Sequence, residues 1–331
     1  MEYIKLFLLV LLMAFVGNIG AVMAASDNLT PDELVSKIKE MVNDYREVVA
    51  YDQALAKFGN AALPAIDRGL AEGTVGQRWC VLRALADISG DESTSLLVEV
   101  IGRGYSDSLT GWAISFLENR PIRRPLSPEE LEALVSRIEN KVIGVASLAA
   151  MVLSNCEKMS VDVRLTPILA RFKKEIISPT DFPTPTNIQL LDSSPLPPRI
   201  NILGSFLISM KQIGEGGIPK IREARKEASG NTELDKWLLL ALGMAGDKSI
   251  AGELKEFIQK EPDRYIRAEA VHAYAASAKQ DAVPFLTTLL DDTTESEYGR
   301  DPNSPTGKAR LISDAAKNEL AGLKPEPTVQ K

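Results

Sequence analysis

The chain has 331 residues, of which 45% are hydrophobic and 25% are charged, and these proportions exclude a wholly disordered protein. Its formal net charge of −7 argues against general nucleic-acid binding, because attraction to phosphate needs a basic surface. Aromatic residues make up only 6% of the chain, which favours thin helix-on-helix packing over a thick aromatic core.

The beginning of the chain, residues 1–24, is typical of a secretory signal peptide. Lys5 is followed by the apolar run LFLLVLLMAFV, and the small residues Val22 and Ala24 precede a cleavage point. We expect cleavage after Ala24 or one residue later, and therefore an exported mature chain that is periplasmic or secreted. The alternative is an uncleaved membrane anchor over residues 6–25, which could just span a bilayer.

Two capping boxes predict where helices begin. Thr30–Glu33 begins a leading helix over residues 31–44, and Ser127–Glu130 begins a second helix farther along the chain. Both have Pro at the first helical position, where its missing N–H has no helical partner to lose.

A proline motif recurs in the stretches ALPAIDRGL, LTPILARFK, GIPKIREAR and AVPFLTTLL. Its prolines, each followed two residues later by Ile or Leu, are Pro64, Pro167, Pro219 and Pro284. Their spacing fits a period of about 32 to 34 residues. We therefore expect each of these prolines in the first turn of the second helix of a repeat.

A second pattern describes the repeat itself. RALADISGDESTSLLVEVI (83–101) and LALGMAGDKSIAGELKEFI (240–258) share Ala-Leu, then Gly-Asp, then an apolar helical stripe. Gly can end a helix in the left-handed region and Asp can cap the next one, which predicts a helix–turn–helix unit. Such helix pairs are expected near 46–72, 75–103, 108–140, 142–176, 200–229, 232–260 and 264–290, with a last helix over about 308–322. No alternation of period two is long enough to predict a sheet.

These motifs resemble the HEAT-repeat family, in particular the short HEAT-like repeats also found in phycobilisome lyases. The resemblance implies an all-α, armadillo-type fold, a right-handed superhelix of about seven helix pairs with terminal capping helices. The solenoid would cover residues 27–322, interrupted by a Pro-rich insertion at 177–199 and an acidic loop at 291–307, and would leave 323–331 as a flexible tail. The resemblance to HEAT repeats also implies that the second helices of the pairs line the concave side.

The sequence offers little for catalysis. His272 is the one histidine, and we interpret it as a partly exposed helix residue. Cys80 and Cys156 fall in helices about two repeats apart, too far for a disulfide, so we expect two buried thiols. The sequence therefore predicts no catalytic residue, no cofactor and no metal ligand. We interpret the acidic loop as a solvated linker; an irregular calcium site is the alternative.

Basic residues mark two of the second helices and carry the prediction of a partner-binding site. The basic candidates are Arg164, Arg171, Lys174, Lys220, Arg222 and Arg225. Phe182 of the Pro-rich insertion is an apolar candidate beside them. If the two helices are neighbours, their charge would attract an acidic partner. The alternatives are a solvated face, since Glu175, Glu223 and Glu227 are interspersed, and an ordered spacer for the insertion.

These observations favour an exported, non-enzymatic scaffold that binds a protein or peptide partner on the concave face of a helical array. The alternatives are an enzyme or accessory subunit that acts on an envelope or extracellular substrate, and a membrane-anchored envelope organiser. We expect no nucleic-acid partner, and no integral membrane domain once the signal peptide is cleaved.

Overall fold

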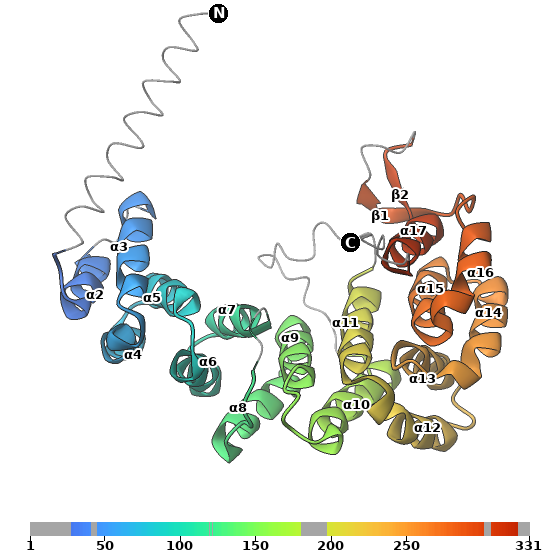
Figure 1. Ribbon diagram of the computed structural model, residues 1–331, viewed down its shortest axis with the longest axis horizontal. Coiled ribbons are helices and arrows are strands. Elements are labelled where there is room, and N and C mark those ends of the chain that lie inside the picture. Colours follow the sequence, from blue (N-terminus) through green and yellow to red (C-terminus); the bar gives the residue numbers. More distant parts are fainter. Residues whose placement is uncertain are drawn as a thin grey trace, which may run out of the picture. The chain divides into compact units, whose positions relative to one another are not determined.

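The structure is a computed structural model that describes residues 28–40, 45–118, 120, 122–179, 197–300 and 306–323. It is all-α apart from one short pair of strands (Figure 1). The chain divides into two compact units, one ending at Arg137 and the other beginning at Ile138. The signal-like segment 1–24, Phe182 and most of the Pro-rich insertion lie outside the described residues.

The first unit begins with the leading helix and continues with helix pairs. Its helices are α2 (Pro31–Glu40), α3 (Tyr45–Lys57), α4 (Leu63–Glu72), α5 (Val75–Asp87), α6 (Asp91–Arg103), α7 (Asp107–Glu118) and α8 (Pro128–Ile138). Both predicted capping boxes are present. The Glu33 N–H donates to Thr30 Oγ1 and Glu33 accepts from the Thr30 N–H, and Ser127 and Glu130 make the same reciprocal pair.

The second unit continues the same alternation to the last described helix. Its helices are α9 (Ile143–Ser154), α10 (Val161–Ile177), α11 (Pro198–Ile213), α12 (Ile218–Glu227), α13 (Thr232–Met244), α14 (Ala251–Lys260), α15 (Arg264–Ala278), α16 (Val283–Thr288) and α17 (Leu311–Leu323). The helix pairs predicted along both units are thereby confirmed.

The first helices of the pairs form the inner layer of the second unit. They contact one another in turn, α9 with α11, α11 with α13, and α13 with α15. Figure 1 shows α10, α12, α14 and α16 on the outer side of this unit. This differs from the expectation that second helices line the concave side. The physical reason lies in the small residues of the first helices, which let them approach closely on the inside of the curve, as Gly243 does against Ala273.

The core of the second unit is centred on α13. Every residue from Trp237 to Ala245 is buried, which fits a helix packed against neighbours on both sides. Trp237 meets Phe172 of α10 edge to face, with ring centroids 6.3 Å apart, and Phe206 of α11 packs against the same Phe172 ring. This cluster joins three helices and fixes where α10 and its basic residues lie.

Three of the four motif prolines lie where the sequence predicts them. Pro64, Pro219 and Pro284 stand in the first turns of α4, α12 and α16. Each follows a short 3₁₀ turn that begins five residues earlier at a positive-φ residue: Gly59, Gly214 or Lys279.

Pro167 is different, because it lies inside α10. Asp162 occupies the position five residues earlier and is itself part of the helix, so no turn precedes the proline. The helix begins instead at Ser160, whose side chain caps the Val163 N–H. The prediction that Pro167 opens a second helix is therefore wrong.

The acidic loop contains structure that the sequence did not predict. Strands β1 (Glu295–Arg300) and β2 (Lys308–Arg310) pair in antiparallel fashion. They are held by polar contacts with α15: the Tyr265 hydroxyl accepts from the Glu297 N–H at 3.2 Å, and Arg264 donates to the Glu295 carbonyl at 3.2 Å. Strands held by polar contacts need no alternation of apolar and polar residues. The search for such alternation in the sequence therefore did not find them.

Two further findings concern the chain as described. Cys80 and Cys156 are buried thiols that form no disulfide, as expected. In the part of the chain that the structure describes, none of the helices combines the length and apolar character needed to cross a membrane.

Candidate interaction surfaces

The two basic helices predicted from the sequence are neighbours in the second unit. Lys173 of α10 pairs with Glu227 of α12, with Nζ 3.4 Å from the carboxylate. Lys220 of α12 reaches back to α10, where its Nζ lies 3.0 Å from Asp162 Oδ1 and 2.7 Å from the Thr166 hydroxyl. The two helices that carry the candidate residues are therefore in contact, on the outer side of this unit.

Two of the candidate arginines are buried and serve the fold. Arg164 is 7% exposed and donates to the Ser154 carbonyl at the end of α9, at 2.6 Å. Arg171 is 2% exposed; it pairs at 2.8 Å with Glu175, one turn on, and donates to the Asn140 carbonyl. Because their guanidinium groups are used inside the protein, neither side chain is available to a partner.

The other candidates lie nearer to solvent, but each of them meets a carboxylate. Lys174 pairs with Glu139 at 3.1 Å. Arg222 makes paired hydrogen bonds to Asp247, both at 2.8 Å, and a third to the Ser249 hydroxyl. Burial raises the pKa of Asp247, but the hydrogen bonds from Arg222 and Ser249 outweigh burial and hold that pKa below its ordinary value.

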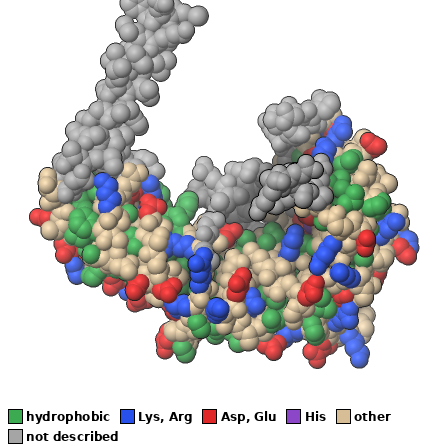
Figure 2. Space-filling model, viewed as in Figure 1, with side chains coloured by type: hydrophobic (Ala, Val, Ile, Leu, Met, Phe, Trp, Pro, Cys, Tyr) green, Lys and Arg blue, Asp and Glu red, His purple; other side chains and the backbone are tan. Residues whose placement is uncertain are grey.

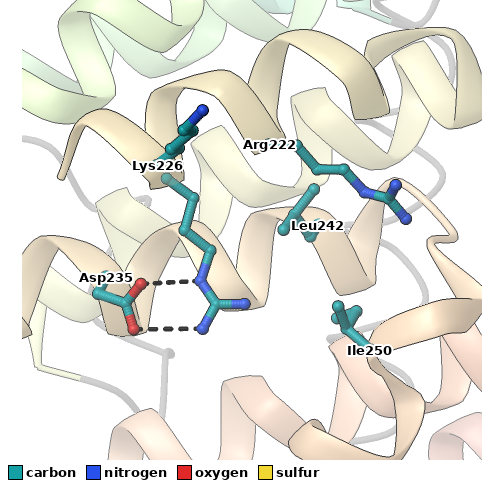
Figure 3. A pocket seen from close by; sticks show the side chains of 6 residues that line it. Arg222, Lys226, Asp235, Leu242 and Ile250 are labelled. Carbon is teal, nitrogen blue, oxygen red and sulfur yellow. Dashed lines mark hydrogen bonds and ion pairs between the residues drawn. The ribbon is translucent and has the colours of Figure 1, made fainter. Parts of the chain in front are cut away.

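Arg225 is the most heavily engaged of these cations. Its Nε and Nη2 donate to the two carboxylate oxygens of Asp235 on α13, at 2.8 and 3.2 Å (Figure 3). Its Nη1 also donates to Glu253 of α14 at 3.0 Å. One side chain of α12 therefore ties that helix to both helices of the next pair, in the bidentate geometry that suits arginine.

Arg222, Arg225 and Asp235 line an open hollow of about 370 Å³, together with Lys226, Leu242 and Ile250 (Figure 3). Its three cations, Arg222, Arg225 and Lys226, are balanced in number by three carboxylates that pair with the two arginines: Asp247 with Arg222, and Asp235 and Glu253 with Arg225. The hollow thus has no excess of positive charge, and Figure 2 shows both signs intermixed over this unit. The arrangement can fix helix positions, but it does not select an acidic partner by net charge.

The repeat that carries this hollow can be compared with known families. Residues 218–299 match the family model of HEAT repeats, which covers α12 to α16 and nearly all of β1. A search of the curated proteins finds no match to the chain.

The match to HEAT repeats includes Arg222 and Arg225 and the helices that their ion pairs join. HEAT repeats are stacked helix pairs, each of which contacts mainly its neighbours. Both arginines lie inside the matched segment and join the α12 pair to the α13–α14 pair. Their ion pairs therefore hold successive helix pairs together. The helix pairs outside residues 218–299 have the same two-helix form.

Sequence reasoning missed an aromatic surface in the first unit. Trp79 of α5 and Trp112 of α7 meet edge to face, with ring centroids 6.5 Å apart, and Phe116 lies one turn beyond Trp112. Trp112 is 40% exposed. The guanidinium of Arg83 lies 4.9 Å from the Trp79 ring centroid. The signal was available in the sequence, because tryptophan is rare in this chain and 112 and 116 are one helical turn apart.

A buried acid lies beneath this aromatic surface. Asp52 of α3 is 1% exposed, and Arg83 Nε is 3.5 Å from its Oδ2. Burial raises the pKa of Asp52 to about 6 against the opposing charge of Arg83. Burial and the Asp52 charge raise the pKa of the Cys80 thiol to about 11, which leaves it protonated and unreactive at neutral pH.

No group of three or more His, Cys, Asp or Glu residues within the described ranges is placed to hold a metal ion. The ion pairs and hydrogen bonds of Arg164, Arg171 and Arg225 have structural roles. The most developed polar clusters of the second unit hold helices together.

Proposed function

We propose that this protein is an exported, non-enzymatic scaffold that binds a protein or peptide partner on its stacked helices. The observation that carries the proposal is the HEAT segment at residues 218–299, because HEAT repeats generally mediate interactions between proteins. Stacked pairs offer a long surface on which a partner can make many modest contacts. Export is proposed from the signal-like residues 1–24.

Two surfaces are the candidates for partner contact. On the charged surface of α10 and α12, Lys174, Lys220 and Lys226 lie near solvent. Exposed ion pairs such as Lys174–Glu139 and Lys220–Asp162 are worth only about 0–1 kcal/mol. Carboxylates of a partner could therefore replace Glu139 and Asp162 at little cost. The aromatic surface presents Trp112, a residue type enriched at the energetic centres of interfaces.

The test of binding is affinity capture with the tagged mature chain from its own envelope or medium. Each captured protein is then purified and titrated against the chain to obtain a Kd. Lys220→Ala combined with Lys226→Ala tests the charged surface, and Trp112→Ala tests the aromatic surface. Lys260→Ala is the matched control, because Lys260 is an exposed lysine of α14 that pairs with Glu256, one turn away on the same helix.

We expect one surface variant to weaken binding at least tenfold while Lys260→Ala leaves the Kd unchanged. Failure of every captured protein to bind saturably to the purified chain would contradict the scaffold proposal. Export is tested separately, by N-terminal sequencing of the protein recovered from envelope and medium. We expect a new N-terminus at residue 25 or 26, and an intact N-terminus in the cytoplasmic fraction would contradict export.

A further inference from the structure

The one histidine of the chain joins the last described helix to its neighbour. His272 lies on α15, and its Nδ1 is 2.7 Å from Glu319 Oε1 on α17. Both side chains are partly shielded, at 28% and 20% exposure. The buried face of α17 is otherwise mainly apolar, with Leu311, Ile312, Ala315 and Ala316. The His272–Glu319 pair adds a polar link to this apolar contact. The helix is also tied by the Ser313 hydroxyl, which donates to the Leu290 carbonyl at 2.9 Å, and by Gln280, which donates to the Leu323 carbonyl.

The charges around His272 come from three helices. Glu269, one turn earlier on α15, is 7% exposed and faces α11, where a Cβ atom placed on Gly204 would lie 3.2 Å from its carboxylate. Lys211 of α11 and Glu319 of α17 are the other charged groups that act on the ring. On the α13 side, α15 meets its neighbour through small side chains, such as Ala273 against Gly243.

The position of the proton follows from these contacts. Burial lowers the pKa of His272, but the hydrogen bond with Glu319 and the charges of Glu269 and Glu319 outweigh burial, so the pKa lies above its ordinary value. For Glu319, burial raises the pKa and the contact with His272 lowers it, with a net decrease. Burial raises the pKa of Glu269. In mildly acidic solution the ring is thus charged and faces an ionised Glu319.

We propose that His272 and Glu319 form a proton-dependent latch that holds the helix α17 on α15. The contribution of His272 is fully present below its unfolded-state pKa of about 6.5 and is lost as the pH rises through its folded-state pKa. Ionisation of the buried Glu269 at higher pH also disfavours the folded arrangement. Raising the pH therefore loosens α17 and uncovers the side of α15 against which it packs. This regulation of one end of the array goes beyond the proposed scaffold function.

Hydrogen exchange measures the latch directly. Amide protection of residues 311–323, corrected for the intrinsic effect of pH, is compared with that of α13 in the same molecule at pH 5.5 and pH 8. We expect the protection of α17 relative to α13 in the wild-type chain to fall severalfold from pH 5.5 to pH 8. His272→Gln and Glu319→Gln should abolish that difference. Lys317→Gln, which breaks only the pair with Asp314 inside α17, should retain it.

A second measurement covers the case in which a variant undocks α17 altogether. The single histidine gives one imidazole resonance, whose titration midpoint in the wild-type chain should lie above the ordinary value of about 6.5. Glu319→Gln should lower that midpoint. An unchanged relative protection of α17 across pH, or a wild-type midpoint at or below the ordinary value, would overturn the proposal.

Discussion

Gly243 of α13 lies directly against Ala273 of α15. A Cβ atom placed on Gly243 would come within 2.9 Å of both the Cβ and the carbonyl oxygen of Ala273, and within 2.6 Å of the Leu254 side chain. Real Cβ atoms do not approach backbone so closely, so the two helices can hold this spacing only while the position is glycine. The inner layer of the second unit depends on this approach.

Replacing this glycine should therefore force the helices apart. We expect Gly243→Ala to destabilise the protein by about 1–3 kcal/mol, the usual cost of overpacking a well-packed core. The measurement is urea unfolding followed by circular dichroism. Gly252→Ala is the control, because nothing lies within 4 Å of a Cβ at that helical position of α14, and it should be neutral or slightly stabilising. Equal losses in the two variants would show that close packing is not the cause.

Lys279 carries a strained backbone at the start of the turn before α16. Its φ of 53° and ψ of −126° suit glycine, and the equivalent residues of the other two turns are Gly59 and Gly214. Lys279→Gly should therefore stabilise the protein by about 1 kcal/mol. Lys279→Ala removes the same exposed ion pair with Glu215 but keeps a Cβ, so it should give no gain. Thermal unfolding of the two variants separates the backbone effect from the charge effect.

Pro167 interrupts the hydrogen-bond ladder of α10. It lacks the N–H that would donate one turn back, at Val163, and the neighbouring Thr166 hydroxyl bonds instead to the Asp162 carbonyl at 2.6 Å. We expect Pro167→Ala to stabilise the helix by about 1 kcal/mol or more in chemical unfolding. Pro219→Ala, in the first turn of α12, should give no such gain, because no helical bond is missing there. A loss of stability in Pro167→Ala would mean that the shape imposed by the proline matters more than the bond.

Asp52 should make stability depend on pH in an unusual direction. Its pKa is raised to about 6, so its favourable contribution is complete below the unfolded value of about 3.9 and is lost as the pH rises through about 6. Relative to the wild-type chain, Asp52→Asn should therefore gain on the order of 1–2 kcal/mol between pH 4 and pH 7, after allowance for screening. Urea unfolding at both pH values gives the difference. Glu256→Gln, in the exposed pair with Lys260, should show no comparable gain.

The helical array was predictable because its signals are local. Helix pairs, Gly-Asp turns, capping boxes and three of the four motif prolines follow from helix-end chemistry, which depends on a few neighbouring residues. Pro167 was mispredicted because Ser160 caps α10 upstream of it, so that Asp162, five positions before the proline, is already helical. The strands β1 and β2 were missed because contacts with Arg264 and Tyr265 of α15, distant in sequence, hold them.

The candidate site was less predictable. The sequence placed Arg164, Arg171, Lys220, Arg222 and Arg225 on two neighbouring helices, which the structure bears out. It could not show which of these cations are buried, or that Asp235, Asp247 and Glu253 lie opposite the others. Charge neutralisation depends on side chains from different helix pairs, and no local pattern in the sequence records that pairing.

By itself, the sequence determined the type of unit, its period and most helix boundaries, because these depend on the backbone and on residues within a few positions of one another. Only the tertiary structure decided which helices lie inside the curve, which charges are paired, and that the single histidine, on α15, contacts Glu319 on α17. Those properties depend on the distance between side chains that lie far apart in the chain, and folding alone sets that distance.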